Sequence, residues 1–143
     1  MKTKSISQYT LIIILIIAVA FFACPNHEDV PSERFNLLTN HIWVNDSLLA
    51  DGVEAGGPGE TLEAFNGDTK FDVDGTGYIG TFTGDWGFNK NETQITIFSD
   101  DLLIPVTVNV VELTTSSFKI TTNFPSQSSP GVYIDVRMTF KPK

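Results

Sequence analysis

The sequence predicts an all-β fold, an antiparallel up-and-down meander of about eight strands. The first observation is the strict alternation of apolar and polar residues in several segments, which is typical of strands with one buried and one solvated face. The second is the stretch 70–89, where Asp74-Gly75 and Gly84-Asp85 separate three short apolar runs. Such dipeptides favour tight hairpin turns. A meander of this length buries its apolar face by curling into a barrel or, alternatively, by folding into a two-sheet sandwich.

Residues 1–23 are predicted to be a signal peptide that precedes this domain. Lys2 and Lys4 form a short basic region, and thirteen apolar residues follow at 11–23. A helix of that length rises about 20 Å, whereas the hydrocarbon core of a bilayer is about 30 Å thick. The layout is therefore typical of a secretory signal peptide, with an uncleaved membrane anchor as the alternative.

The sequence Phe21-Phe22-Ala23-Cys24 resembles the lipobox of Bacteroidetes lipoproteins, with Phe where Leu is usual at its first position. The resemblance implies that Cys24 is acylated and becomes the first residue after cleavage, so that 24–31 is an acylated cysteine and tether. Cys24 is the only cysteine, so it cannot form an internal disulfide, and acylation explains it better than redox chemistry. The expected location is the bacterial cell envelope, with the chain lipid-anchored to the outer membrane. Glu28 and Asp29 resemble acidic signals for surface display.

The charge of the mature chain excludes some partners. The chain has nine basic and seventeen acidic residues, and two of the basic ones lie in the signal, so the mature charge is 7 − 17 = −10. Nucleic acid binding needs clustered Lys and Arg, and so does binding an anionic membrane through a basic face. We therefore expect no nucleic acid partner and a membrane partner only through the N-terminal lipid.

The domain at 32–143 is expected to begin with a short helix. Ser32 is predicted to be its N-cap, and 33–38 forms about one and a half turns with Phe35 and Leu38 facing inward. A helix this short is unstable alone, so it must pack against the sheet, where it would plug one end.

The remaining elements are strands, turns and loops. Besides the meander, strands are predicted at 42–44, 93–98, 103–110, 118–124 and 132–140, with a short strand or turn at 61–65. Ile104 and Val132 are expected to face inward as the first alternating residues of their strands. Residues 51–60 contain four glycines and one proline, which predicts a flexible loop.

Several stretches carry a resemblance to a known family. They are Phe35-Asn36-Leu37-Leu38, Trp43, Phe71-x-x-Asp74-Gly75-x-Gly77-Tyr78, Gly84-Asp85-Trp86-Gly87-Phe88, Val111-Glu112-Leu113-Thr114 and the alternating final strand. Together they resemble the lipocalin-like lipoproteins of Bacteroidetes over most of the mature chain. The resemblance implies an up-and-down β-barrel with a short N-terminal helix and an apolar ligand site inside it. His41 stands where other lipocalins have the glycine of Gly-x-Trp, a departure that concerns ligand binding more than fold.

Five aromatic residues are predicted to line that ligand site: Trp43, Phe71, Tyr78, Phe82 and Trp86. Trp and Tyr offer apolar area together with a polar group, which suits the mouth of a cavity. The loop 51–60 would then act as a lid. The alternative is that most of these residues are core, because an eight-stranded barrel is either filled by bulky side chains or holds one small ligand.

Metal, cofactor and catalytic sites are not predicted. Transition-metal sites need several converging ligands, and the only histidines are His27 and His41. The stretch around Asp74-Gly75 resembles part of a calcium loop, but Thr81 stands where its bidentate Glu belongs, so we interpret it as a hairpin turn. No nucleophile has an evident neighbouring base, so no enzyme activity is expected.

We therefore predict a non-enzymatic, envelope-anchored lipoprotein whose lipocalin-like barrel binds a small, partly apolar ligand. The alternative is a filled barrel that serves as a protein or polysaccharide interaction module at the cell surface. Bulky inward residues favour the filled barrel, and the glycine-rich loop favours the ligand binder.

A glycan is predicted on Ser47. Asp46-Ser47-Leu48 resembles the O-glycosylation acceptor of Bacteroidetes, in which Asp precedes Ser or Thr and an aliphatic residue follows. The intact mass of the native protein should therefore exceed the mass of the acylated chain by that of a glycan. A mass without this increment would remove the prediction.

Overall fold

The computed structural model describes residues 30–102, 104–126 and 131–143. The chain divides into two compact units, residues 1–30 and 31–143. Val30 alone is described in the first unit, so the predicted signal peptide and Cys24 lie outside the described residues. The second unit is the β domain.

The β domain contains one α-helix, one short 3-10 helix and nine strands among its described residues. They are α2 (Glu33–Thr39), β1 (Ile42–Ala50), β2 (Val53–Glu54), η1 (Glu63–Phe65), β3 (Asp68–Phe71), β4 (Thr76–Ile79), β5 (Phe82–Phe88), β6 (Gln94–Phe98), β7 (Val106–Leu113), β8 (Phe118–Pro125) and β9 (Tyr133–Pro142).

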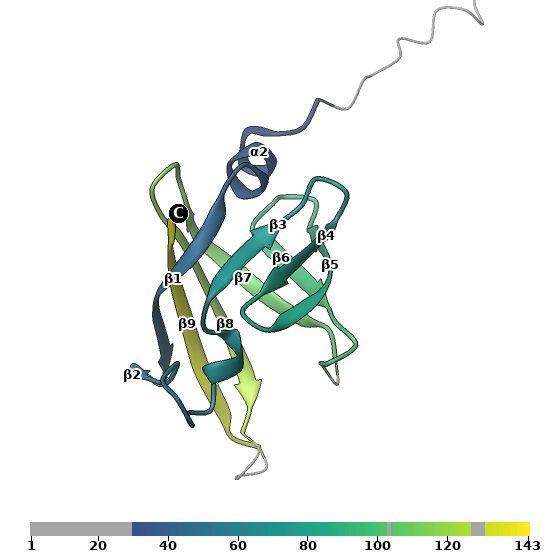
Figure 1. The fold of residues 1–143 in the computed structure, drawn as a ribbon. Helices are drawn as coiled ribbons and strands as arrows, with labels where there is room; N and C mark the ends of the chain where they lie inside the picture. Colours follow the sequence, from purple (N-terminus) through teal and green to yellow (C-terminus); the bar gives the residue numbers. More distant parts are fainter. Residues whose placement is uncertain (1–29, 103, 127–130) are drawn as a thin grey trace, which may run out of the picture. The chain divides into compact units, whose positions relative to one another are not determined.

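Eight of the described strands form a closed antiparallel barrel (Figure 1). From β3 to β9 each strand pairs with the next, β1 pairs with β3, and the pairing of β1 with β9 closes the circle. The short β2 adds a hairpin to the end of β1. The predicted all-β meander is confirmed in its barrel form, because a closed ring of hydrogen bonds leaves no separate second sheet.

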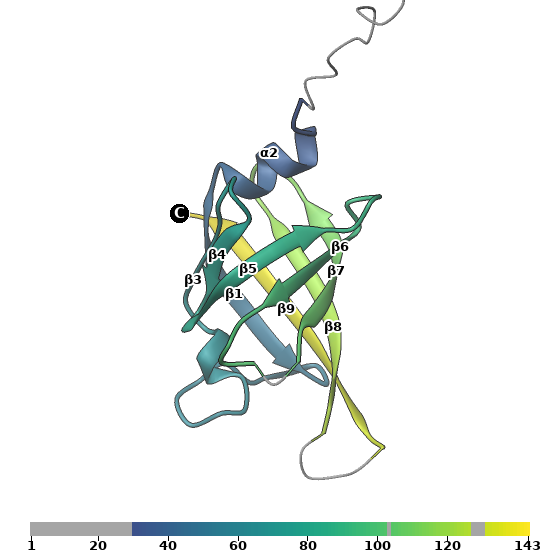
Figure 2. The same ribbon diagram turned by 90° about the vertical axis from the view of Figure 1, so that its right-hand side faces the viewer.

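Helix α2 lies across one end of the barrel, as predicted (Figure 2). The hydroxyl of Ser32 accepts a hydrogen bond from the amide of Phe35 at 2.9 Å, which satisfies one of the free amides of the first turn. Leu38 is fully buried, and the indole Nε1 of Trp43 donates to its carbonyl at 3.0 Å. Lys70 Nζ donates to the carbonyl of Thr39, the last residue of the helix, and to that of His41 just beyond it. The helix is therefore held to β1 and β3 by its C-terminal carbonyls.

Alternation correctly predicts the inward face of the long strands. The buried residues that follow the predicted alternation are Val106, Val108, Phe118, Ile120, Val136, Met138 and Phe140. Leu113 is also buried, but it lies beyond the predicted strand and after the bulge between Val110 and Glu112, which shifts the alternation. The prediction is wrong for Ile104 and Val132, which precede their strands and are 62% and 54% exposed. Pro105 has no amide to donate, so the β7 ladder begins only at Val106.

The turns of the central meander differ in part from the prediction. A turn does lie at 72–75, where Gly75 has a φ of +88° and its amide donates to the carbonyl of Asp72. The second predicted turn, at Gly84-Asp85, is wrong because both residues lie inside β5. The chain turns instead at Gly80-Thr81, with a φ of +56° at Gly80. Segment 61–65 contains η1 rather than a strand.

Gly84 is needed for a close approach of two strands rather than for a turn. A Cβ at this position would lie 1.9 Å from the carbonyl oxygen of Phe98 on β6. Gly77, its partner on β4, has the same restriction, since its Cβ would lie 2.3 Å from the carbonyl oxygen of Lys70. The paired glycines therefore let the barrel wall bend sharply across β3 to β6.

Replacing Gly84 by alanine is expected to lower the free energy of unfolding by about 2–3 kcal/mol, because two backbones must move apart. Gly87→Ala in the same strand is the matched control, because no heavy atom lies within 4 Å of its added Cβ. That control should change stability by less than about 0.5 kcal/mol. Urea unfolding followed by tryptophan fluorescence measures both, and equal stabilities would contradict the close approach.

Candidate functional site

Three of the five residues predicted to bind a ligand lie in one buried aromatic cluster beneath α2. Trp43, Phe71 and Trp86 are 0%, 3% and 8% exposed. The ring of Phe71 lies 5.2 Å from that of Trp86 and 5.9 Å from that of Phe118. Trp43 also packs on Phe118, at 5.4 Å, and Phe35 of α2 stacks on Trp86 at 5.6 Å. These aromatic rings contact one another and fill the helix end of the barrel.

The indole nitrogens of this cluster form hydrogen bonds to backbone carbonyls of the protein. The indole Nε1 of Trp43 donates to the carbonyl of Leu38, and that of Trp86 donates to the carbonyl of Asp72 at 3.1 Å. A buried indole N–H requires such a partner. Both tryptophans therefore have the contacts of core residues.

The other two predicted residues, Phe82 and Tyr78, lie outside this aromatic cluster. Phe82 packs on Phe65 of η1 at 4.6 Å, and Phe65 in turn lies 6.0 Å from Phe124. Tyr78 is half-buried and precedes the buried Ile79 in β4, so it faces the outside of the barrel. Four of the five residues, Phe71, Tyr78, Phe82 and Trp86, nevertheless border one small cavity, whereas Trp43 does not.

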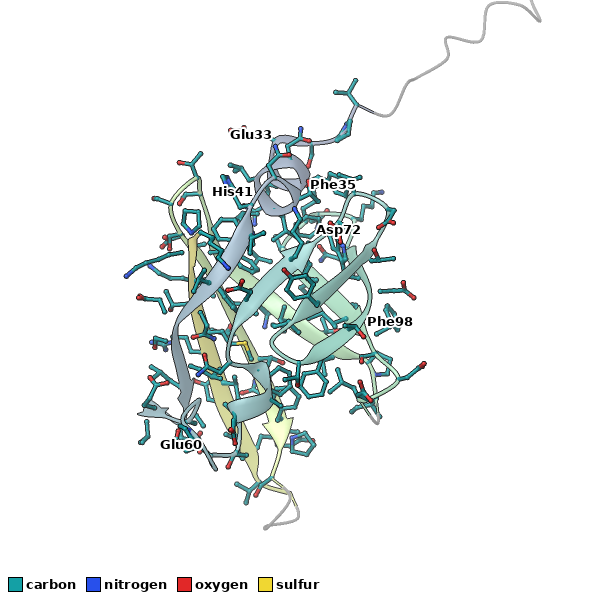
Figure 3. All side chains as sticks on the ribbon, in the orientation of Figure 1. Glu33, Phe35, His41, Glu60, Asp72 and Phe98 are labelled. Atoms are coloured by element: carbon teal, nitrogen blue, oxygen red, sulfur yellow. The ribbon has the colours of Figure 1, made fainter. Side chains whose placement is uncertain are left out.

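The described residues leave little free volume inside the barrel. Two cavities lie within it, each of about 10 Å³. One is bordered by Phe71, Phe82 and Trp86, and the other by Phe65, Ile120 and Met138. Ligand pockets have volumes of roughly 300–1,000 Å³, and about 10 Å³ corresponds to a single water. Figure 3 shows the side chains that occupy this space.

The segment predicted to be a lid forms part of the barrel wall. Beyond the short strand β2, the amide of Ala55 donates to the carbonyl of Leu48 at 2.9 Å. The amide of Leu62 then donates to the carbonyl of Ala55 at 3.0 Å, and both side chains are buried. Since β1 pairs with β3 only over its first residues, this segment covers the part of β1 that β3 does not reach.

The other residues singled out in the sequence, Ser47 and His41, lie in or beside strand β1. Ser47 lies within β1 opposite Thr139, directly after a bulge, and is half-buried. A glycan on it stays a prediction. The ring of His41 packs edge-on against Trp43, 5.2 Å away. In the described part of the chain, no three His, Cys, Asp or Glu residues come together as metal ligands would.

Among the described residues, three charged groups have shifted pKa values, and all three belong to pairs on the outer surface. The hydroxyl and then the amide of Thr76 lower the pKa of Asp74, whose Oδ1 accepts from them at 2.7 and 3.0 Å. This geometry agrees with the hairpin interpretation of the Asp74-Gly75 motif. The side chain of Lys119 lowers the pKa of Glu112, and a hydrogen bond to Asp68 raises the pKa of Lys143.

Larger hollows lie on the outside of the barrel, and two of them are bordered by described residues. One, of about 740 Å³, is bordered by the loop that contains Gly56, Glu60 and Glu63. Its carboxylates already form hydrogen bonds within the loop. Glu60 accepts from the amide of Gly57 at 2.8 Å, and Glu63 accepts from the amide of Gly59 at 2.7 Å. These charges therefore stabilise the loop.

The second hollow, which we call the Phe98 groove, has a volume of about 550 Å³. Its described lining residues are Thr83, Gly84, Asp85, Phe98, Ser99, Asp100, Asp101, Leu102, Ile104 and Pro105. Phe98 is 49% exposed and points outward from β6 (Figure 3). Asp85 stands directly opposite it in the β5–β6 register, so the ring and the carboxylate lie side by side on the outer face.

The Phe98 groove lies at the end of β5 and β6 remote from α2. Ser32 Oγ donates to Glu92 Oε1 at 2.6 Å, which places the β5–β6 turn beside the helix. Phe82 and Phe98 lie at the other ends of these two strands. Figure 2 shows that β5 and β6 run away from α2 toward these ends, so the groove residues Phe98 and Ser99 lie apart from the helix.

Neither Phe98 nor Asp85 is among the predicted site residues, although a signal for Phe98 is present. Ile95 and Ile97 face inward, so the aromatic residue after Ile97 must face outward. An outward aromatic with a carboxylate opposite is visible only once the register of β5 with β6 is known.

Comparison with known protein families gives no match to any family model, and no curated protein is significantly similar to the chain. The resemblance to lipocalin-like lipoproteins therefore stays a prediction. No helix in the described ranges combines the length and the apolar character needed to cross a bilayer.

If Trp86 is a core residue, Trp86→Ala should lower the free energy of unfolding by about 3–5 kcal/mol, as large-to-small changes in cores do. Phe98→Ala is the matched aromatic control on the outer surface and should cost less than about 1 kcal/mol. Chemical denaturation monitored by far-UV circular dichroism compares them. A small effect for Trp86 would contradict its assignment to the core.

Proposed function

We propose that this protein is a lipid-anchored envelope protein whose filled β-barrel acts as a non-enzymatic interaction module. Its partner binds on the outside of the barrel, and the Phe98 groove is the contact site. The eight-stranded barrel itself is also compatible with ligand binding inside, as lipocalins show by analogy of fold alone.

The observation that carries the proposal is the filled interior. Cavities of about 10 Å³ hold no molecule larger than water. The residues that would have contacted an internal ligand instead contact one another, and both buried indoles already have hydrogen-bond partners. Opening the barrel for a ligand would require separating these rings from each other and from α2.

An apolar probe distinguishes a filled barrel from a ligand carrier. Residues 25–143 titrated with a fluorescent fatty acid should show no saturable increase in fluorescence, because the interior lacks room. Trp86→Ala serves as the comparison, since its mutation enlarges the interior near the aromatic cluster. Saturable one-to-one binding to the wild-type chain would overturn the proposal.

The anchor is tested by Cys24→Ala. The wild-type chain should sediment with membranes and have a mass increased by a diacylglyceryl group, because acylation requires the thiol. The variant should lose that mass and leave the membrane fraction. His27→Ala, three residues along the same tether, is the control and should sediment like the wild type. A variant that keeps its membrane association would favour the uncleaved anchor.

A further inference from the structure

We infer that the Phe98 groove binds a positively charged, partly apolar segment of a partner protein, through an Arg or Lys side chain that lies over the Phe98 ring. The inference rests on the proposed function and specifies the partner's chemistry. It follows from the exposed apolar surface of the groove, from its unpaired carboxylates and from the position of the basic residues.

The groove exposes apolar surface on a strand and on the loop that follows it. Phe98 is 49% exposed, Ile104 is 62% exposed, and Pro105 beside it is also exposed. Single exposed apolar residues are ordinary, but grouped ones that line a concave surface are typical of interaction sites. A volume of about 550 Å³ lies within the range of sites that hold a ligand or a few side chains.

The carboxylates of the groove have no partner within the described chain. Of the fifteen acidic side chains at 30–143, nine accept a hydrogen bond or form an ion pair. The six that do neither are Glu33, Asp72, Asp85, Asp100, Asp101 and Asp135. Three of the six line the Phe98 groove. This concentration of uncompensated charge favours a cationic partner.

The basic residues of the domain do not lie in the groove. Lys119, Lys141 and Lys143 pair with Glu112, Asp46 and Asp68. Lys70 and Arg34 donate to backbone carbonyls near α2. Lys90 and Arg137 are not among the described residues that line the groove either, so this lining contributes carboxylates and no basic side chain.

The register of β5 and β6 places an aromatic face next to a carboxylate. A guanidinium or ammonium group over the Phe98 ring interacts with the π face, and the adjacent Asp85 can accept its N–H groups. The two side chains stand on paired strands, and Gly84, which has no Cβ, allows the backbones of those strands to approach closely. The strand pairing fixes the backbone positions of both residues, which lowers the entropy cost of binding.

The inference is tested with the full chain, purified in a non-ionic detergent and titrated with fluorescent peptides. The probe is a short peptide of alternating arginine and leucine, and its control carries glutamate in place of arginine. We expect saturable binding of the basic peptide alone. Raising NaCl from about 50 mM to about 500 mM should weaken it roughly tenfold, because exposed charges are screened.

Two double variants locate the site. Asp85→Asn with Phe98→Ala should weaken binding of the basic peptide at least about tenfold, since it removes both the charge and the ring. Asp72→Asn with Val73→Ala is the matched control, because it removes one unpaired carboxylate and one exposed apolar side chain near α2. Far-UV circular dichroism confirms that both variants are folded, because neither change touches the core.

Three outcomes would overturn the inference: equal binding by both double variants, equal binding of the acidic peptide, or binding of a neutral oligosaccharide such as maltohexaose without binding of the basic peptide. The last would assign the groove to a saccharide. The fatty acid titration reports separately on the proposed function. If the fatty acid does not bind and the basic peptide does not bind either, this inference is wrong and the proposal of a filled barrel still stands.

Discussion

The packing of aromatic rings beneath α2 is the constraint on which the rest of the barrel depends. Trp43, Phe71 and Trp86 come from three strands that are not all neighbours, and their rings meet at the helix end of the barrel. Phe35 of α2 adds a ring from above, and the carbonyl of Leu38 binds the indole of Trp43. Helix, strands and interior are therefore one packed unit.

The strands and their inward faces can be predicted from alternation within each segment, but the way the strands close into a barrel cannot. Alternation along 118–124 and 133–140 predicts which residues face inward, because the side chains of a strand point to opposite faces in turn. Gly84 shows the limit of this reasoning. Glycine beside aspartate is a turn signal in sequence, yet Gly84 lies inside β5. Glycine is needed there because the carbonyl of Phe98 occupies the space that a Cβ would take. Such a contact between different strands has no local signature.

The candidate site was less predictable than the fold, for a related reason. Aromatic residues in a β protein are equally suited to a core and to a cavity wall, and the difference is whether neighbouring rings touch. For Trp86 they do, on three sides. The Phe98 groove unites residues of β5, of β6 and of the connection to β7, and alternation reveals only that Phe98 faces outward. The convergence of its carboxylates depends on strand register.

The pairing of β1 with β9 has a consequence for how the chain acquires its structure. The first and last strands of the domain are neighbours, so the ring of hydrogen bonds cannot close until β9 has been made. Contacts between such distant segments slow folding, because a long loop must be ordered before they form. Until β9 is made, the edge of β1 that it covers stays exposed. That open edge can pair with other chains, so the unfinished domain is open to aggregation until its final strand is in place.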